Sequence, residues 1–232
     1  MVHDSSADAS APPLAGLFGL AFIIGLLVAM GALAFFGWLA DEMLEGSTRA
    51  MDDAVRAAVH HFAAPGLTRT FELASRLGGP SVLAPLGVIA VGVFLLCHWQ
   101  RGAILLAVAM AGAGVLDGTL KYAFHRTRPA PFFDYPEPHS YSFPSGHALF
   151  AFCFFTTVAA LAAPRVRSPV LRVLFWLVAA ALVLLIGVSR IYLGVHYPSD
   201  VLAGYTAGLL WVAIVSTGDR ILHHRAKSRG GA

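Results

Sequence analysis

The sequence SRIYLGVHYPSD, residues 189–200, lies between two long apolar runs and carries an arginine, a histidine and an aspartate. Pro198 suits the first turn of a helix, because its φ is fixed and its missing N–H is not needed there. A helix that begins at Pro198 places Asp200 in its first turn and His196 at its mouth, about 6 Å apart along the axis. The carboxylate can then hold one imidazole nitrogen and leave the other for nucleophilic attack or proton transfer.

This stretch has two interpretations. Arg190 offers a planar fork of donors that fits phosphate oxygens, so the three charged or titratable side chains are consistent with chemistry on an anion. The same residues are consistent with an ion pair that ties the end of a membrane helix to its loop. Taken alone, the stretch does not favour either interpretation, and the rest of the chain has to separate them.

The composition indicates an integral membrane protein. Apolar residues make up 57% of the 232 residues and charged residues only 12%, about half the charged share of a soluble domain. The net charge of +3 is explained by basic loop ends, and no basic stripe with interleaved aromatic residues indicates a nucleic-acid partner. Cys97 and Cys153 both lie inside apolar runs, so we expect them to behave as small apolar residues without a disulfide.

Six apolar stretches are long enough to cross the hydrocarbon core, which requires about 17–25 residues. They are Leu14–Ala40, Ser81–Cys97, Gly102–Phe124, His147–Ala163, Arg172–Val188 and Asp200–Thr217. We therefore predict an all-α fold, a bundle of six transmembrane helices that forms one domain over residues 14–217. Residues 1–13 are expected to be a disordered tail and residues 218–232 a basic cytoplasmic tail.

The first loop, Asp41 to Pro80, is the longest. One part of it has apolar residues at helical spacing, namely Met51, Val55, Ala58, Val59 and Phe62. Polar residues lie on the opposite side of that helix, namely Asp52, Asp53 and Arg56. The pattern predicts an amphipathic helix at the membrane surface. A second helix is expected to lead into the second span, with an apolar face made of Leu67, Phe71, Ala74 and Leu77.

The basic residues of the short loops predict the orientation. Six spans place one group of them on the same face as the N-terminus: Arg101, Arg165, Arg167, Arg172, Arg220, Arg225, Lys227 and Arg229. The positive-inside rule makes this face cytoplasmic, although the bias is modest because the first loop also holds four arginines. We expect a multi-pass protein of the bacterial inner (plasma) membrane with both termini in the cytoplasm.

A second concentration of polar residues follows the third span. Lys121 lies near the end of that span, Arg128 lies just outside it, and Ser145, Gly146 and His147 open the fourth span. An even number of crossings separates this loop from the stretch at 189–200, so both emerge on the extracytoplasmic face. Eight residues can meet there: Lys121, Arg128, Ser145, Gly146, His147, Arg190, His196 and Asp200.

Each of these residues has a physical task in phosphoryl transfer. Ser145 and Gly146 begin a helix, where free N–H groups favour an anion and glycine permits close approach. The three cations can spread positive charge over phosphoryl oxygens, a task often given to magnesium. His147 can protonate a leaving oxygen while His196 attacks phosphorus. Each part alone has an ordinary explanation, since interfacial Lys and Arg often snorkel to headgroups and Pro-Ser-Gly-His can be a turn.

The three blocks together resemble a known signature. Lys121-x6-Arg128-Pro129, Pro144-Ser145-Gly146-His147 and Ser189-Arg190-x5-His196-x3-Asp200 are similar to the three-part phosphatase signature of the type-2 phosphatidate phosphatase superfamily. That superfamily includes membrane lipid phosphate phosphatases, undecaprenyl pyrophosphate phosphatases, phosphatidylglycerophosphate phosphatases, glucose-6-phosphatases and soluble vanadium haloperoxidases. Every defining position matches, and the six-span layout agrees as well.

The resemblance implies a mechanism. His196 would be the nucleophile that forms a phosphohistidine, Asp200 would orient it, and His147 would be the general acid that later activates water. The substrate phosphate would be bound by Lys121, Arg128, Arg190, Ser145 and the Gly146 backbone. We expect no metal ion and no other cofactor, because the loops lack the clustered carboxylates of a metal site.

Other polar residues have simpler interpretations. Asp117 is one helical turn before Lys121, and we expect an ion pair between the two. His60 and His61 are adjacent without acidic or cysteine partners, which is typical of surface residues and not of a metal site. Four residues near the loop are given no catalytic role, although they can shape access: His125, Asp134, Glu137 and His139.

The sequence therefore predicts a metal-independent lipid phosphate phosphatase whose partners are membrane lipids and its lipid phosphate substrate. Undecaprenyl pyrophosphate and phosphatidate are favoured as substrates, with phosphatidylglycerophosphate and lipid A phosphates as further candidates. One alternative is a lipid phosphotransferase with the same site, since water and an alcohol attack the same intermediate. Another is a non-catalytic lipid-binding or transport protein, which is disfavoured because no internal repeat is present and the charges gather at one surface instead of the midplane.

Overall fold

The computed structural model describes residues 14–136 and 139–229, and within them it is helical, with no strand. The helices are α1 (Leu14–Glu45), α2 (Arg49–His61), α3 (Pro65–Leu77), α4 (Pro80–Leu96), α5 (Gln100–Phe124), α6 (Gly146–Ala162), the 3-10 turn η1 (Ala163–Arg165), α7 (Pro169–Tyr192) and α8 (Pro198–Arg229). Side chains are described for residues 23–136 and 139–222. The tail predicted at residues 1–13 lies outside the described residues.

In the described residues, five helices are long and apolar enough to cross a membrane, and the bent pair α3–α4 makes a sixth candidate. The predicted all-helical membrane bundle is therefore confirmed. Three helices end later than the predicted spans: α1 ends at Glu45 instead of Ala40, α7 at Tyr192 instead of Val188, and α8 at Arg229 instead of Thr217. The reason is that an apolar run marks the depth of the hydrocarbon, whereas the helical hydrogen bonds continue into polar sequence.

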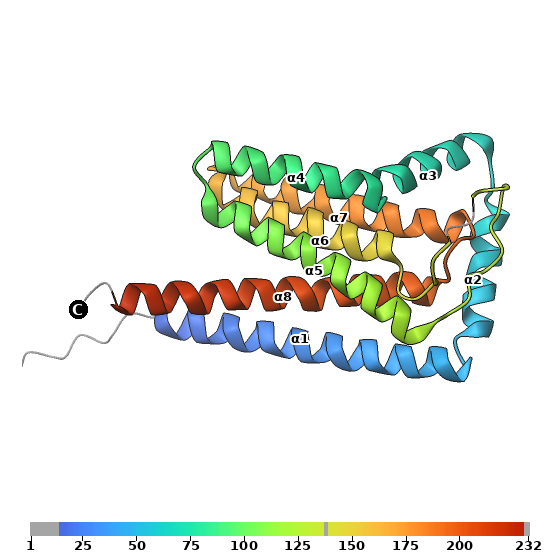
Figure 1. Ribbon diagram of the computed structural model, residues 1–232, viewed down its shortest axis with the longest axis horizontal. Helices are drawn as coiled ribbons and strands as arrows, with labels where there is room; N and C mark the ends of the chain where they lie inside the picture. Colours follow the sequence, from blue (N-terminus) through green and yellow to red (C-terminus); the bar gives the residue numbers. More distant parts are fainter. Residues whose placement is uncertain (1–13, 137–138, 230–232) are drawn as a thin grey trace, which may run out of the picture.

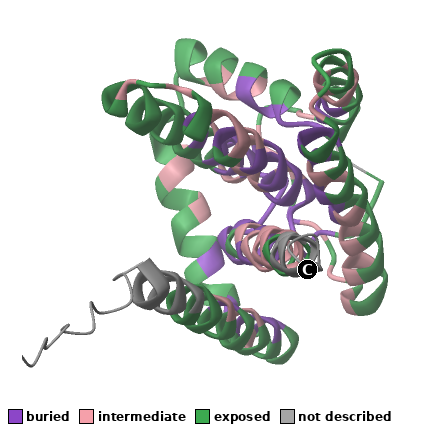
Figure 2. Cartoon of the chain, turned by 90° about the vertical axis from the view of Figure 1, so that its left-hand side faces the viewer, coloured by how far each residue is buried: buried purple, intermediate pink, exposed green. Residues whose placement is uncertain are grey.

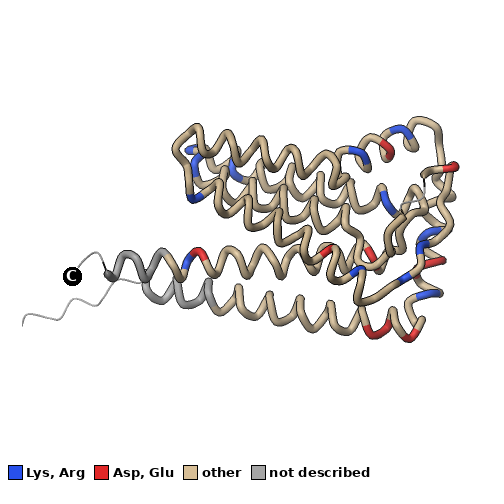
Figure 3. The backbone as a smooth tube through the Cα atoms, in the orientation of Figure 1, with Lys and Arg blue, Asp and Glu red and all other residues tan. Residues whose placement is uncertain are grey.

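The long helices run side by side, and α2 lies across one end of them (Figure 1). Charged residues gather towards the two ends of the bundle, with mostly uncharged helix between them (Figure 3). Helix α6 is the central element, since more than half of its span is buried, whereas at most 28% is buried in each of the other four candidate spans (Figure 2). The main core consists of residues of α6, including Leu149, Cys153 and Phe154, packed against α4, α5, α7 and α8.

The outward faces of the bundle are apolar. Leu33 of α1, Val88 of α4 and Val170 of α7 are all more than 60% exposed. In a bilayer these side chains contact lipid, and the helical backbone satisfies its own polar groups, as a membrane interior requires. The exposed apolar surface is thus the surface of a multi-pass membrane protein.

Both helices expected in the first loop are present, and α3 leads into α4 through a bend of 49°. Helix α2 turns one face towards the protein, where Asp52 is fully buried. Its apolar side chains Met51 and Val55 are exposed, as is Phe62 directly after the helix. This arrangement fits a helix on a membrane surface, and that location stays a prediction.

Helices α6 and α8 pack closely, so their first turns lie next to each other. At Gly204 of α8, an added methyl group would lie 2.6 Å from the carbonyl oxygen of Ser145. Glycine therefore permits a backbone approach that any side chain would prevent. The approach brings the first turns of the two helices together, and the candidate site is built there.

Candidate active site

The polar residues of the three sequence blocks lie at the end of the bundle that α2 crosses. At this end α5 and α7 finish and α6 and α8 begin, so two loops that are distant in sequence meet (Figure 1). The loop at 193–197 turns through Gly194, whose φ of +76° favours glycine. An added methyl group there would also lie 2.6 Å from the backbone nitrogen of Phe132, which belongs to the other loop.

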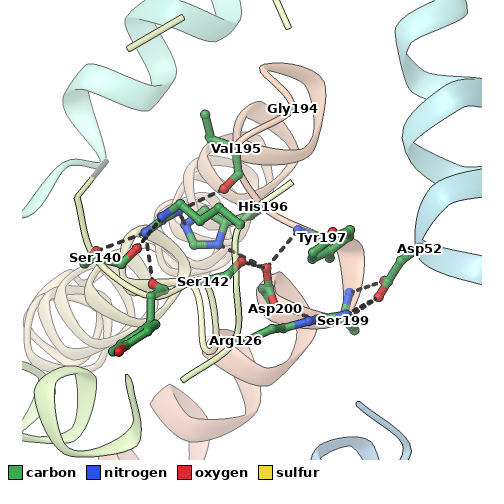
Figure 4. Close-up of polar contacts among 12 residues, drawn as sticks. Asp52, Arg126, Ser140, Ser142, Gly194, Val195, His196, Tyr197, Ser199 and Asp200 are labelled. Carbon is green, nitrogen blue, oxygen red and sulfur yellow. Dashed lines mark hydrogen bonds and ion pairs between the residues drawn. The ribbon is translucent and has the colours of Figure 1, made fainter. Parts of the chain in front are cut away.

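His196 lies between a carboxylate and a guanidinium (Figure 4). Its Nδ1 is 3.3 Å from Asp200 Oδ2, and its Nε2 is 2.8 Å from Arg128 Nη1. Since an arginine only donates hydrogen bonds, Nε2 must accept, which assigns the hydrogen to Nδ1. The carboxylate therefore holds the imidazole by Nδ1–H and leaves the lone pair on Nε2 directed at the cationic side of the site.

The environment keeps this imidazole uncharged. Burial lowers the pKa of His196 to about 3, and the positive charges of Arg128 and Arg190 act in the same direction. The hydrogen bond to Asp200 opposes the shift but does not outweigh it. At neutral pH the ring is thus in the form that has a free electron pair, as a nucleophile requires.

The carboxylate of Asp200 is bonded on both oxygens. Oδ2 accepts from the backbone N–H of Tyr197 at 2.9 Å and from the hydroxyl of Ser142, besides facing His196. Oδ1 accepts from Arg126 Nη1 at 2.6 Å. Asp200 is fully buried, so these bonds fix the direction in which each oxygen points.

Arg128 is held by the loop around it. Its guanidinium donates to the carbonyl oxygens of Ser140 at 2.6 Å, Val195 at 2.9 Å and Tyr141 at 3.1 Å. These contacts place Nη1 against His196 Nε2. A cation in this position can bind an anion that the histidine attacks.

Arg190 is buried, with 1% of its surface exposed. Its Nη1 donates to the hydroxyl of Ser75, and its backbone oxygen accepts from the N–H groups of Val195 and His196. In the described part of the chain, Arg190 Nε and the Oγ of Ser145 have no hydrogen-bond partner. Buried polar groups without partners are costly, and phosphate oxygens would satisfy both.

The start of α6 carries the second block. Ser145 precedes the helix, and its N–H donates to the backbone oxygen of Asp200 at 2.9 Å. At Gly146 an added methyl group would lie 2.6 Å from Asp117 Oδ1 and 3.1 Å from Lys121 Nζ. The predicted pair of Lys121 with Asp117 is present at 2.8 Å, and it lies directly beside the helix N-terminus.

His147 is the second residue of α6 and is half-buried. Its imidazole interacts electrostatically with four other groups of the site: Arg190, His196, Lys121 and Arg128. The structure therefore brings all eight predicted residues to one end of the bundle. Their roles in catalysis stay predictions.

An open cleft of about 1100 Å³ is lined by two of these eight residues, Lys121 and Arg128, and by Arg126. Its walls also include hydroxyl-bearing side chains, namely Tyr122, Thr127, Ser140 and Tyr141. This volume is far larger than a phosphate group, so a polar headgroup can enter beside it. His139 also lines the cleft, while Glu137 lies outside the described residues.

Several polar residues of the site were not predicted. Arg126 lies between Lys121 and Arg128 in sequence and bonds to Asp200, but it occupies no position of the recognised pattern. Asp52 was assigned to the polar side of a surface helix, yet it is buried against Arg126 and Ser199. The only sequence signal for this pairing was a basic cluster in one loop and an acidic cluster in another.

His60 also differs from the expected surface residue. It is half-buried, and its ring stacks on Phe132 with the centroids 4.0 Å apart. In the part of the chain that the structure describes, no three His, Cys, Asp or Glu side chains are arranged to hold a metal ion.

Comparisons with known proteins agree with this arrangement. Residues 102–220 match the model of the PAP2 superfamily. Phosphatidylglycerophosphatase B of Bacillus subtilis is 32% identical over 185 residues, which cover 78% of this chain and 89% of that protein. An undecaprenyl-diphosphatase of Sulfolobus acidocaldarius is 33% identical over 49% of this chain and 52% of its own length. The crystal structure of a transmembrane PAP2-type phosphatidylglycerolphosphate phosphatase from Bacillus subtilis has a TM-score of 0.74 and 31% identity, and the alignment covers 83% of this chain and 96% of that one.

Proposed function

Since the chain belongs to the PAP2 superfamily, whose matched relatives are lipid phosphatases, we propose that it removes phosphate from a membrane lipid through a phosphohistidine intermediate. The observation that carries the mechanism is the state of His196. Its Nδ1–H faces Asp200, its Nε2 lone pair faces Arg128, and burial keeps the ring neutral.

The phosphate group would bind between the cations. Arg128, Arg190 and Lys121 compensate its charge, and the N-terminus of α6 adds the N–H groups at Gly146. The unpartnered donors Ser145 Oγ and Arg190 Nε support this position for the phosphate. When an anion arrives, Arg128 Nη1 transfers its hydrogen bond from His196 Nε2 to a phosphate oxygen, which frees the lone pair.

In the first chemical step, Nε2 of His196 forms a bond to phosphorus and the bond from phosphorus to the lipid oxygen breaks. His147 has to be protonated at this stage, which the negative charge of the bound phosphate favours against the surrounding cations, and it gives its proton to the leaving oxygen. In the second step, His147 takes a proton from water as the water oxygen attacks phosphorus. The P–N bond breaks, inorganic phosphate leaves, and His196 returns to its neutral state. Asp200 stabilises the positive charge that the ring carries in the intermediate.

Phosphatidylglycerophosphate is the substrate that we rank first. The alignment with phosphatidylglycerophosphatase B covers most of both proteins. The hydroxyl-lined cleft can also accept a glycerol beside the phosphate. This order differs from the sequence-based preference for undecaprenyl pyrophosphate or phosphatidate. Undecaprenyl pyrophosphate is the second candidate, because the Sulfolobus undecaprenyl-diphosphatase matches about half of this chain.

We further propose that the site faces the extracytoplasmic side of the bacterial inner membrane. The cationic loop ends at Arg101, Arg165 and Arg172 belong to the opposite end of the bundle, where α4–α5 and α6–α7 connect. The positive-inside rule assigns that end to the cytoplasm. Helix α1 begins and helix α8 finishes at this same end of the bundle (Figure 1). This placement supports cytoplasmic termini.

The proposal is tested by phosphate release from a panel of lipid phosphates in detergent, with wild type, His196→Ala and Asp200→Asn. His196→Ala removes the atom that attacks phosphorus, so its turnover should fall to background. Asp200→Asn keeps the nucleophile but loses its orientation, so a residual rate should be measurable. The panel ranks phosphatidylglycerophosphate against undecaprenyl pyrophosphate and phosphatidate.

Two further observations complete this test. Acid-labile, base-stable ³²P on the protein, present in wild type and absent in His196→Ala, would identify the phosphohistidine. Equal and mild losses in both variants would rule out the assignment of His196 as the nucleophile.

A further inference from the structure

Arg126 bridges two carboxylates that come from opposite ends of the sequence (Figure 4). Its Nη1 donates to Asp200 Oδ1 at 2.6 Å, and its Nη2 donates to Asp52 Oδ2 at 2.8 Å. The Arg126 side chain is 10% exposed, and both carboxylates are fully buried. Charges at such depth are costly unless they are paired, so each member of this bridge depends on the others.

Asp52 also fastens α2 to the start of α8. Its Oδ1 accepts the backbone N–H of Ser199 at 2.9 Å, and its Oδ2 accepts the Ser199 hydroxyl at 2.6 Å. Ser199 lies in the first turn of α8, where backbone N–H groups have no partner within the helix. Asp52 thus caps the N-terminus of α8 although it belongs to another helix. The residue that it binds, Ser199, is the neighbour of Asp200, which holds His196.

The donors of Arg126 are already used inside the protein. Besides the two carboxylates, Nη1 donates to Ser199 Oγ at 2.7 Å and Nη2 donates to Thr48 Oγ1 at 3.3 Å. The four hydrogens of the two terminal nitrogens therefore have four protein acceptors. Arg190, in contrast, keeps a buried nitrogen without a partner. This difference separates Arg126 from Arg190. Arg128 also has its donors bonded within the protein, but one of them meets His196 Nε2, the atom that we propose attacks phosphorus, whereas Arg126 meets only carboxylates and hydroxyls.

The bridge helps to fix which oxygen of Asp200 faces the imidazole. Arg126 holds Oδ1, while the Tyr197 N–H and the Ser142 hydroxyl hold Oδ2 against Nδ1 of His196. Without the guanidinium, one side of the carboxylate is released, and its hydrogen bond to Nδ1–H loosens. The ring is then less firmly held, although Arg128 still requires Nε2 to accept.

We propose that Arg126 is a positioning residue that holds Asp200 and, through it, His196, and that Asp52 acts by holding Arg126. This gives α2 of the first loop a direct part in the active site, and it rests on the proposed phosphatase function. Arg126 acts through Asp200 and does not touch the substrate phosphate.

The first experiment compares Arg126→Met with wild type. Loss of a buried charge-assisted bond should lower kcat about 10- to 100-fold, while KM and the inhibition constant of inorganic phosphate change less than about 3-fold. The matched control is Arg101→Met, which breaks another Arg–Asp pair, Arg101 Nε to Asp219 Oδ1 at 2.8 Å, at the opposite end of the bundle. Arg101→Met should retain the wild-type kcat.

The second experiment is a double-mutant cycle. Asp52→Asn should lower kcat less than Arg126→Met does, because Asn still accepts one hydrogen bond from Ser199. The double variant should be no slower than Arg126→Met alone, since Asp52 acts through the arginine. Independent, multiplying losses would overturn the bridge.

A third readout does not need turnover. In ¹⁵N-histidine-labelled protein, assigned by comparison with His196→Gln, the His196 nitrogens should report the Nδ1–H tautomer in wild type. In Arg126→Met the Nδ1 resonance should shift, because its hydrogen bond to Asp200 loosens. An unchanged Nδ1 resonance overturns the inference, whether or not wild type releases phosphate. A wild type that releases no phosphate would count against the proposed function and leaves this readout intact.

Two kinetic results would also overturn the inference: a kcat within 2-fold of wild type, or an unchanged kcat with phosphate inhibition weakened 10-fold or more. The latter would move Arg126 into the phosphate site. If Arg126→Met does not fold, Arg126→Lys decides between the same outcomes, because one ammonium group cannot bond Asp52 and Asp200 in the fork geometry of arginine.

Discussion

The short distances around Gly146 allow the effect of a Gly146→Ala substitution on phosphate binding to be predicted from geometry. In Gly146→Ala, the new methyl group would lie 2.6 Å from Asp117 Oδ1 and 3.1 Å from Lys121 Nζ, whereas ordinary contacts begin at 3.4 Å. The carboxylate therefore has to retreat by about 0.8 Å, and Lys121, bonded to it at 2.8 Å, moves with it or loses the bond. The methyl group also covers the N-terminus of α6.

The effect should appear in phosphate binding and hardly in stability. Alanine is favoured over glycine in a helix by up to about 1 kcal/mol, which offsets the displacement of two flexible side-chain ends. Loss of one charge-assisted bond to the phosphate costs about 1.5–3 kcal/mol. The inhibition constant of inorganic phosphate should therefore rise about 10- to 100-fold, with a melting temperature within a few degrees of wild type.

The assay is competitive inhibition of lipid phosphate hydrolysis by inorganic phosphate, alongside a thermal melt in the same detergent. Gly92→Ala in α4 is the matched control, because nothing lies within 4 Å of its added methyl group. An inhibition constant and a KM within 2-fold of wild type in Gly146→Ala would refute the placement of the phosphate at this helix end.

Two other predictions concern metal and pH. Activity should persist after treatment with EDTA, because the cations that compensate the phosphate are side chains; a loss that magnesium restores would contradict this. The pKa of His196, lowered to about 3 by burial, lies below the value near 6.5 of the unfolded chain. Its contribution to stability is therefore complete above pH 6.5 and declines as the pH falls towards 3, by at most about 1.4 kcal/mol per pH unit. Thermal melts between pH 4.5 and 7 should show a shallower decline for His196→Gln than for wild type, and equal slopes would be evidence against a neutral, buried ring.

The sequence was sufficient to locate the spans and the eight residues of the three blocks. Charges are rare in a membrane protein, so Lys121, Arg128 and Arg190 stand out against the apolar helices around them. The Pro198 start of α8 was also readable, because proline suits the first turn of a helix. These features depend on local chemistry that a single chain displays.

The contacts of Arg126 with Asp52 and Asp200 could not be predicted from the sequence, for a physical reason. The polar face of an amphipathic helix gives the same periodicity whether it faces water or protein, so the burial of Asp52 left no mark in the pattern. Its partners are 74 and 147 residues away along the chain. Only the packing of α2 across the end of the bundle decides which charges meet.

The same long separation has a consequence for biosynthesis. The ribosome makes Asp52 early, Arg126 midway and Asp200 with α8, so Arg126 has only one of its two carboxylates until α8 inserts. His196 and Asp200, the proposed nucleophile and the carboxylate beside it, both come after the other members of the bridge. On the proposed mechanism, the nascent protein therefore lacks a competent active site until α8 is in place.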